Sequence, residues 1–273
     1  MTIGTVVTTV FNGSSFCERY CDVVEHAVQA GVNLSWTLFD DGSTDGTIST
    51  LKQMASSRKL LEHIQITELG RLGRSRALNA AVNLVTSEYL FIHDFDDVSF
   101  PQRFVEQTAL LDSDPHLGCV GGGYRHVDLN SGTIEARSLS FDSIRFLERF
   151  PLYVPFPHTF MAFRKSAVAA VGGYPEWDDY EEMGLLAALL DGNWKIGSVS
   201  KIMGEHFIYE HSYFERQHGF TRRRWRNLKR QLAMKRRYNS VRATYMMMLA
   251  RFAYNFLPPS LKSMARRAAG YAT

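Results

Sequence analysis

Three clusters of acidic residues have the residue types and spacing that chemistry requires. They lie in the segments DDGSTDGT from Asp40, DFDD from Asp94 and WDDYEE around Asp178 and Asp179. Carboxylates at positions i and i+2, such as Asp94 and Asp96, can share one divalent cation, and an all-oxygen ligand set favours Mg²⁺ or Mn²⁺. The DFDD segment therefore predicts a metal site that neutralises the diphosphate of a nucleotide.

The first cluster follows a short apolar run and combines two carboxylates with a turn. Asp40 and Asp41 could accept hydrogen bonds from a base N–H and from ribose hydroxyls, Gly42 permits the turn, and Asp45 can cap the next helix. Taken alone, this segment could equally be a helix-capping turn, and an isolated DFDD could be a solvated acidic loop. Their occurrence together, each directly after an apolar run, favours a functional site over these two alternatives.

The elements that must position these clusters alternate between strand and helix patterns. Apolar runs predict strands at 2–11, 34–39, 64–68 and 89–93, and helical spacing with capping residues predicts helices at 16–30, 45–55, 74–84 and 101–111. This order predicts an α/β fold, Rossmann-like, with a mainly parallel sheet and helices on both faces. Ligands of such sheets bind beyond the carboxyl ends of the strands, where both segments lie.

The second half of the chain has a more mixed pattern. Short strands are predicted at 119–123, 124–128, 133–136 and 160–163, and helices at 165–171 and 181–190. We expect one domain at 1–215, made of two halves, 1–97 and 98–215. A C-terminal helical, basic extension would follow at 216–273.

Taken together, these segments resemble the inverting family 2 glycosyltransferases of the GT-A fold. The segment TTVFNG from Thr8 resembles the first-strand motif of that family, although Thr9 stands where a proline is common. The segment RLGRSRALN from Arg71 resembles the stretch that leads into the helix before the metal motif. The resemblance extends over roughly residues 2–211, and the joint occurrence of the segments is more specific than any one of them.

The resemblance implies that 1–215 is a catalytic domain, with a nucleotide-sugar-binding half (1–97) and an acceptor-binding half (98–215). It also implies roles for individual residues. Asp41, with Asp40 beside it, would read the base, and Asn12 would lie in the nucleotide pocket. Arg71 and Arg76 are candidates for the pyrophosphate, with surface charge as the alternative. The implied nucleotide-binding set comprises Thr8, Val10, Asn12, Asp40, Asp41, Arg71, Arg76, Asp94 and Phe95. The implied metal ligands are Asp94 and Asp96, with Asp97 as a neighbour or alternative and His211 as a further ligand.

The family also places an acidic pair after a Gly-Gly-Tyr turn, here residues 172–174. In that register Asp179 matches the catalytic base and Asp178 its acidic neighbour. A carboxylate there would take the proton of an attacking sugar hydroxyl, and attack opposite the leaving diphosphate would invert the anomeric carbon. Favourable placement of acids at a helix N-terminus is the alternative explanation. For the metal histidine, His206 is a weaker rival of His211.

The charge of the chain is strongly asymmetric. From Arg216 to Thr273 there are 15 Lys and Arg and no Asp or Glu, whereas the preceding part carries 16 basic and 28 acidic residues. Such a tail predicts an anionic partner, and its apolar stripe at 245–256 suits a helix on an anionic membrane surface. Packing against the catalytic domain is the alternative. No signal peptide, transmembrane run or disulfide framework is expected, so we expect a cytoplasmic protein, peripheral on the inner face of the membrane.

We therefore expect transfer of a sugar from a nucleotide diphosphate sugar to an acceptor hydroxyl. A UDP-sugar is favoured over a dTDP-sugar, and a lipid-linked saccharide of surface polysaccharide synthesis is the natural acceptor. A nucleotidyltransferase is an alternative, but it should show a Gly-rich basic loop where the FNGS segment stands. A non-enzymatic protein whose tail binds nucleic acid is another, but it leaves the acidic clusters unexplained, and no nucleic acid is expected as a partner.

Overall fold

The computed structural model describes the greater part of the chain. The described residues are 3–138, 146, 150, 154–177, 180–209, 222–238, 245, 246, 249, 250, 252, 253 and 261. The statements below concern these residues.

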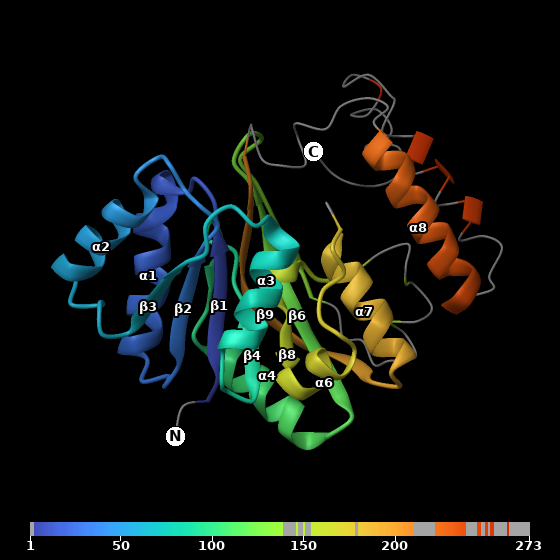
Figure 1. Cartoon of the computed structure of the whole chain (residues 1–273), viewed down its shortest axis with the longest axis horizontal. Helices are drawn as coiled ribbons and strands as arrows, with labels where there is room; N and C mark the ends of the chain where they lie inside the picture. Colours follow the sequence, from blue (N-terminus) through green and yellow to red (C-terminus); the bar gives the residue numbers. More distant parts are fainter. Residues whose placement is uncertain are drawn as a thin grey trace.

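A nine-stranded sheet forms the centre of the molecule, in the order β3-β2-β1-β4-β8-β6-β9-β5, with β7 paired to β6 (Figure 1). Its first half is entirely parallel: β3 (Ile64–Glu68), β2 (Ser35–Asp40), β1 (Thr5–Val10) and β4 (Tyr89–Ile92). Its second half is mixed: β8 (Ala162–Arg164), β6 (Leu117–Asp128), β9 (Lys195–Ile208), β5 (Val98–Ser99) and β7 (Thr133–Arg137).

Helices cover both faces of this sheet. One face carries α1 (Cys17–Gln29), α2 (Thr47–Ser57) and α4 (Gln102–Ser113), and the other carries α3 (Arg74–Leu84), α6 (Lys165–Ala170) and α7 (Glu181–Asp191). Neighbouring strand residues alternate between the two cores: Val6 and Phe91 pack with the first set of helices, and Val7 and Leu90 with the second. Such continuous apolar runs are what a strand buried on both faces requires. The predicted α/β class with a mainly parallel sheet is confirmed.

Two sequence predictions need correction in the second half of the sheet. The strands predicted at 119–123 and 124–128 are one strand, β6, because the glycine run between them makes room for neighbours rather than a turn. A Cβ on Gly121 would lie 2.3 Å from the Phe156 ring, and one on Gly122 would lie 2.2 Å from Met203 Cγ. The longest strand, β9, was not predicted, since glycines and charged residues interrupt any alternating pattern along it.

The seam between the two halves of the sheet is closed by side chains of α4. Strands β4 and β8 share only three residue pairs, and β8 and β6 only two. Arg103, which is fully buried, donates from Nη2 to the carbonyl oxygens of Ile92 (2.8 Å) and Met161 (3.2 Å). Gln107 donates to the carbonyl oxygens of Val120 (3.0 Å) and Phe160 (2.8 Å). The carbonyl oxygen of Met161 also accepts the N–H of Ile92 (2.9 Å), so the two side chains of α4 add donors along a seam that has few strand pairs.

The described part of the tail is mainly the helix α8 (Arg222–Tyr238), which lies beside α7 (Figure 1). Tyr238 Oη donates to the carbonyl oxygen of Ala187 (2.9 Å), and Arg237 Nε lies 3.0 Å from Asp191 Oδ1. The guanidinium of Arg230 lies 4.3 Å from the centre of the Trp177 ring. One side of α8 therefore packs on α7 and on Trp177. None of the helices within the described ranges has the length and apolar character needed to cross a bilayer.

We expect Arg103→Met to lower the free energy of unfolding by about 3 kcal/mol, because several buried oxygens lose their donor at once. Urea denaturation measures this change. The matched control is Arg125→Met, which removes a half-exposed arginine paired with Glu205 on the same sheet and should cost at most about 1 kcal/mol. Equal losses in the two variants would contradict the bridging role of Arg103.

Candidate active site at the carboxyl edge of the sheet

Four loops follow the carboxyl ends of the parallel strands, and hydrogen bonds join them. The N–H of Asn12 donates to Ser43 Oγ (2.9 Å), and the N–H of Thr44 donates to Asn12 Oδ1 (2.8 Å). Asn12 has a φ of +54°, in the left-handed region that Asn tolerates better than most residues. Asp40 accepts the N–H of Ser43 (3.0 Å). Asn12 therefore locks the loop after β1 onto the loop after β2.

Asp41 and Arg71, both predicted to bind nucleotide, lie in direct contact. The buried carboxylate of Asp41 accepts bonds from Arg71 Nη1 (2.5 Å) and from the N–H groups of Leu72 (2.6 Å) and Gly73 (3.0 Å). Arg71 lies over the exposed ring of Phe11, 3.5 Å from its centre. Asp41 thus fixes the loop after β3, while Arg71, with 58% of its side chain exposed, borders the open edge.

Other residues of the predicted nucleotide set lie farther from this edge. The side chains of Thr8, Val10 and Phe95 are buried, so they support the loops at this edge by packing and are not exposed to a ligand. Arg76 points outward and makes an exposed pair with Glu176, with 2.7 Å between Nη2 and Oε2. The surface-charge alternative therefore describes the placement of Arg76.

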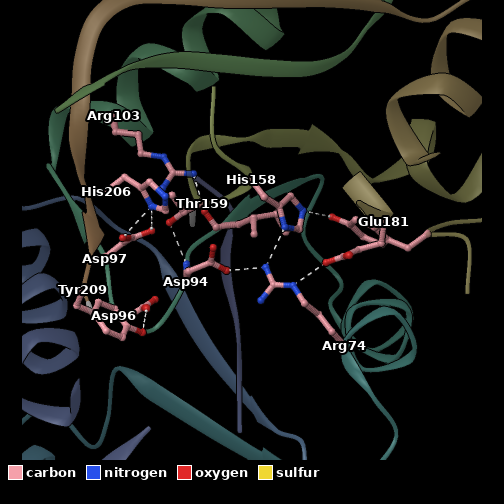
Figure 2. A network of polar contacts seen from close by, with 12 residues as sticks. Arg74, Asp94, Asp96, Asp97, Arg103, His158, Thr159, Glu181, His206 and Tyr209 are labelled. Carbon is pink, nitrogen blue, oxygen red and sulfur yellow. Dashed lines mark hydrogen bonds and ion pairs between the residues drawn. The ribbon is translucent and has the colours of Figure 1, made fainter. Parts of the chain in front are cut away.

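Asp94 belongs to a network that joins the loop after β4 to α7 (Figure 2). Its carboxylate accepts a bond from Arg74 Nη2 (2.8 Å), and its N–H donates to Thr159 Oγ1 (3.0 Å). Arg74 Nε donates to Glu181 Oε1 (2.6 Å), and Arg74 Nη2 lies 3.2 Å from His158 Nδ1. One guanidinium therefore links two carboxylates from different halves of the chain.

Asp96 and Asp97 have separate partners at the end of β9 (Figure 2). Tyr209 Oη donates to Asp96 Oδ2 (2.6 Å). The buried carboxylate of Asp97 lies 3.0 Å from His206 Nδ1 and accepts the N–H of Phe207 (3.0 Å). Asp97 is thus buried against β9, whereas Asp94 and Asp96 are partly exposed.

The carboxylates of this loop differ in protonation. Burial alone would raise the pKa of Asp94, but Arg74 and His158 lower it to about 2. Burial raises the pKa of Asp96 to about 6, and the neighbouring Asp97 and Asp94 add to this shift. Asp96 therefore lies in a field of excess negative charge, which a bound cation would relieve.

The donor chemistry of this loop fits a hard divalent cation. Among the residues that the structure describes, no three His, Cys, Asp or Glu side chains converge as a complete metal cage. Mg²⁺ does not require one, because it is usually held by one or two carboxylates together with substrate phosphates and water. Asp94 and Asp96 supply that number of carboxylates at a site with excess negative charge.

Helix α3 holds the segment that leads to the predicted base. Ser75 Oγ donates to the carbonyl oxygen of Trp177 (2.7 Å). Asn79 Nδ2 donates to the carbonyl oxygen of Tyr174 (2.8 Å), and the N–H of Tyr174 donates back to Asn79 Oδ1 (2.8 Å). Asp178 and Asp179 themselves lie outside the described residues. The chain before them is tied to α3 by these bonds, and the chain after them by the Arg74–Glu181 pair.

Sequence reasoning missed several members of this site. The sequence analysis gave no role to Arg74, His158 or Tyr209, although Arg74 stands inside a recognised segment. Of the two candidates for a metal histidine, His206 is within hydrogen-bond distance of Asp97, and His211 lies outside the described residues. The signal that could have identified Arg74 is its place at the start of a helix, directly after Gly73, which ends the preceding loop.

Comparisons with known proteins agree with this geometry. A family model described as Glycosyl transferase family 2 matches residues 5–172. The chain belongs to this family. The match covers the four parallel strands and the loop that carries Asp94, and the sequence-based assignment to family 2 is confirmed.

Two curated relatives illustrate the level of similarity. The protein named "Putative glycosyltransferase EpsE" of Bacillus subtilis is 33% identical over 169 residues, which cover 61% of this chain and 59% of the relative. The "Amylovoran biosynthesis glycosyltransferase AmsE" of Erwinia amylovora is 30% identical over 133 residues, or 48% and 49% of the two chains. The matched part thus spans less than two thirds of either relative.

Solved structures share the fold. The mannosyltransferase PcManGT from Pyrobaculum calidifontis, in complex with GDP-Man and Mn²⁺, has a TM-score of 0.62 at 19% identity, covering 98% of this chain and 75% of that one. Residues 1–349 of S. aureus TarS, in complex with UDP-GlcNAc, have a TM-score of 0.62 at 14% identity, covering 92% and 71%. The predicted GT-A architecture is confirmed by these similarities.

The Asp97–His206 pair gives this family 2 chain a pH-dependent stability. Burial disfavours charge on His206, but Asp97 raises its pKa to about 9. Because this value lies above that of an unfolded histidine, the stabilisation is complete below about pH 6.5 and is lost as the pH rises through about 9. We expect the stability difference between wild type and His206→Gln to shrink by about 2–3 kcal/mol across this range, as measured by urea unfolding at several pH values.

The control for this prediction is a double-mutant cycle with Asp97→Asn. In that background His206 loses the charge that raises its pKa, so the pH dependence of the His206→Gln effect should disappear. Persistence of the same trend without Asp97 would assign it to another group.

Proposed function

We propose that this chain is an inverting glycosyltransferase that moves a sugar from a nucleotide diphosphate sugar to an acceptor hydroxyl. One observation carries the proposal: the Asp41–Arg71 pair and the carboxylates of Asp94 and Asp96 gather on loops at one edge of a family 2 fold. Base recognition and diphosphate neutralisation need these two groups side by side. A nucleic-acid-binding protein does not explain this combination. A nucleotidyltransferase should show a Gly-rich basic loop where the FNGS segment stands.

The donor end of the proposed site is the Asp41–Arg71 region. Arg71 lies over the exposed ring of Phe11, and Asn12 is on the adjoining loop. A flat aromatic and guanidinium surface beside a carboxylate suits a nucleoside. Similar folds have been solved with GDP-Man and with UDP-GlcNAc, which supports a nucleotide diphosphate sugar as the class of donor. Within that class we favour a UDP-sugar, with a dTDP-sugar as the second candidate.

The proposed cofactor is Mn²⁺ or Mg²⁺, held by Asp94 and Asp96. When bound, the ion would neutralise the charge that develops on the departing diphosphate. The excess negative charge around Asp96 and the Mn²⁺ in the PcManGT complex support this assignment. Asp97 would act by orienting this loop through β9, and a role for His211 stays a prediction.

The proposed catalytic base is Asp179, with Asp178 as its acidic neighbour. A sugar hydroxyl is a weak nucleophile, and a carboxylate within hydrogen-bond reach would accept its proton during attack on the anomeric carbon. A single displacement opposite the diphosphate inverts the configuration. The ties from α3 to Tyr174, Trp177 and Glu181 support this role, because they hold the chain on both sides of the pair close to Asp94.

The proposed acceptor is a saccharide linked to a lipid at the inner face of the cytoplasmic membrane. The division into a catalytic domain, 1–215, and a basic tail, 216–273, is part of this proposal. The outer face of α8 presents the exposed side chains of Arg226, Lys229 and Arg236, with Trp225 at its start. A cationic helix with an exposed aromatic residue suits anionic lipid headgroups. The relationship to AmsE supports polysaccharide assembly as the setting.

A thermal-shift and hydrolysis panel tests the proposed activity. Wild type is combined with uridine, thymidine and guanosine diphosphate sugars, each with Mn²⁺, with Mg²⁺ and without metal. We expect one nucleotide class to raise the Tm by about 5 °C or more near saturation, and only with metal. Asp96→Asn should lose this shift, whereas Asp179→Asn should retain it and lose turnover. The control Asp22→Asn alters an exposed carboxylate on α1 and should behave as wild type. Absence of any metal-dependent shift would refute the active-site assignment.

Vesicle co-sedimentation tests the proposed membrane contact. The triple variant Arg226→Glu, Lys229→Glu, Arg236→Glu should bind vesicles of phosphatidylglycerol at least about a hundredfold more weakly than wild type, because each basic residue near an anionic surface contributes about 1 kcal/mol. The control Lys52→Glu, Lys59→Glu, Lys195→Glu has the same net charge, but its changes lie on exposed positions of the catalytic part. Equal weakening in both variants would show that net charge, not α8, determines binding.

A further inference from the structure

Arg74 occupies an unusual position between the two halves of the proposed site. It is the first residue of α3, and its guanidinium uses two different edges for two carboxylates (Figure 2). Nε donates to Glu181 on the first turn of α7, and Nη2 donates to Asp94 in the loop after β4. A planar guanidinium can make such divergent bonds, whereas a lysine ammonium on a single stem cannot reproduce them.

The contacts at each end of this bridge are specific. On the donor side, Asp94 is also held through its N–H by Thr159. On the other side, Glu181 is nearly buried, and it follows directly the segment that contains the proposed base. His158, which lies 3.2 Å from Arg74 Nη2, also lies 2.9 Å from the hydroxyl of Tyr174 at the start of that segment. The bridge therefore connects the proposed metal carboxylate with both ends of the base segment.

Arg74 also matters for the charge at the donor site. Other basic side chains near the loop after β4 are directed elsewhere: His206 to Asp97, Arg19 Nη1 to the carbonyl oxygen of Asp96, and the buried Arg103 to backbone and side-chain oxygens. In the described part of the chain, the cation bonded to the carboxylate of Asp94 is thus Arg74. A divalent ion bound to Asp94 would compete with the Arg74 bond and would be repelled by the guanidinium.

We propose that Arg74 is a positioning residue that couples occupation of the donor site to the N-terminal segment of α7. With no metal bound, Arg74 holds Asp94 and Glu181 together. Binding of a metal–nucleotide complex draws Asp94 away from the guanidinium, and this change is transmitted through Glu181 to residues 174–190. The inference rests on the proposed function, since it takes Asp94 as a metal ligand and the segment as the carrier of the base.

The direction of the change in metal affinity on removal of Arg74 distinguishes this coupling from a merely structural role. Two cations that compete for one carboxylate weaken each other's binding, and the effect is reciprocal. Removal of Arg74 should therefore tighten metal binding, although it removes two ion pairs from the fold. A variant that only loosens the structure would bind metal more weakly.

The experiment measures binding and local dynamics rather than turnover. Mn²⁺ is titrated calorimetrically into the full chain at saturating uridine diphosphate, and amide hydrogen exchange is followed in peptides covering residues 174–190. In wild type, Mn²⁺ with uridine diphosphate should change the exchange of these peptides. In Arg74→Ala, the affinity for Mn²⁺ should rise about tenfold through loss of the nearby positive charge, and the exchange response should be lost.

Two further variants separate charge from bridging. Arg74→Lys keeps a cation near Asp94 but cannot bond both carboxylates, so its Mn²⁺ affinity should stay within about twofold of wild type while the exchange response disappears. Arg58→Ala is the matched control, because Arg58 also pairs with more than one carboxylate, Asp22 and Glu25, but follows the C-terminal end of α2. That end lies at the edge of the sheet opposite the loops, so both measurements should match wild type.

The outcomes distinguish this inference from the proposed function. If wild type binds neither uridine diphosphate nor another nucleotide diphosphate with Mn²⁺, the proposed function fails. If wild type binds and Arg74→Ala has unchanged or weaker Mn²⁺ affinity, or keeps the exchange response, the coupling role is overturned while the proposed function stands. Tighter Mn²⁺ binding together with a lost response in Arg74→Ala supports it.

Discussion

The hydrogen bonds of Arg103 and Gln107 inside the sheet are the interactions on which the rest of the structure depends. Five residue pairs in total join the parallel half, through β8, to β6. The strand pairing at this seam is short, and buried carbonyl groups that lack a donor are costly. The two side chains of α4 supply four further hydrogen bonds to carbonyl groups there. They also hold Ile92, two residues before Asp94, against Met161, which follows Thr159 and His158 in the chain. Arg103 thus holds both the loop after β4 and the segment that carries His158 and Thr159.

The proposed site is electrostatically unfavourable in the absence of a ligand. Burial together with neighbouring carboxylates raises the pKa of Asp96 to about 6, and burial with Glu181 raises that of Glu182 to about 8. Such clustering opposes folding unless each carboxylate finds a partner. Arg74, His206 and Tyr209 provide partners, but they leave Asp96 short of positive charge. Local strain of this kind is typical of functional sites, where a ligand completes what the fold leaves unsatisfied.

The sequence predicted the parallel half of the fold closely. The strand at 64–68 and the helix at 74–84 coincide with β3 and α3, because apolar runs and helical spacing report burial directly. The second half was harder to predict. In β6 the glycines make space for Phe156 and Met203, and nothing local distinguishes such a glycine from a turn residue. Strand β9 owes its length to pairing with β6 over register shifts, which no single segment encodes.

In the candidate site, residues placed by the strand order could be predicted, whereas their contacts with residues distant in the sequence could not. Asp41 and Asp94 could be predicted because each follows a strand of the parallel half, so topology alone places them at one edge. Their partners could not. Arg74 and Glu181 lie 107 residues apart, and Asp96 and Tyr209 lie 113 apart. Such contacts depend on how the second half folds back over the first, and a single sequence does not record this.

The position of α8 relates the charge asymmetry of the chain to the site. A basic helix beside an acidic body could collapse onto the carboxylates of the donor loop and block them. Instead, α8 packs through Tyr238 and Arg230 on α7 and Trp177, and its outward face keeps exposed basic side chains. Trp177 directly precedes the segment that contains the proposed base. In the proposed function, a membrane surface bound to the outward face of α8 would lie on the far side of α8 from α7, next to the helix that follows the proposed base segment.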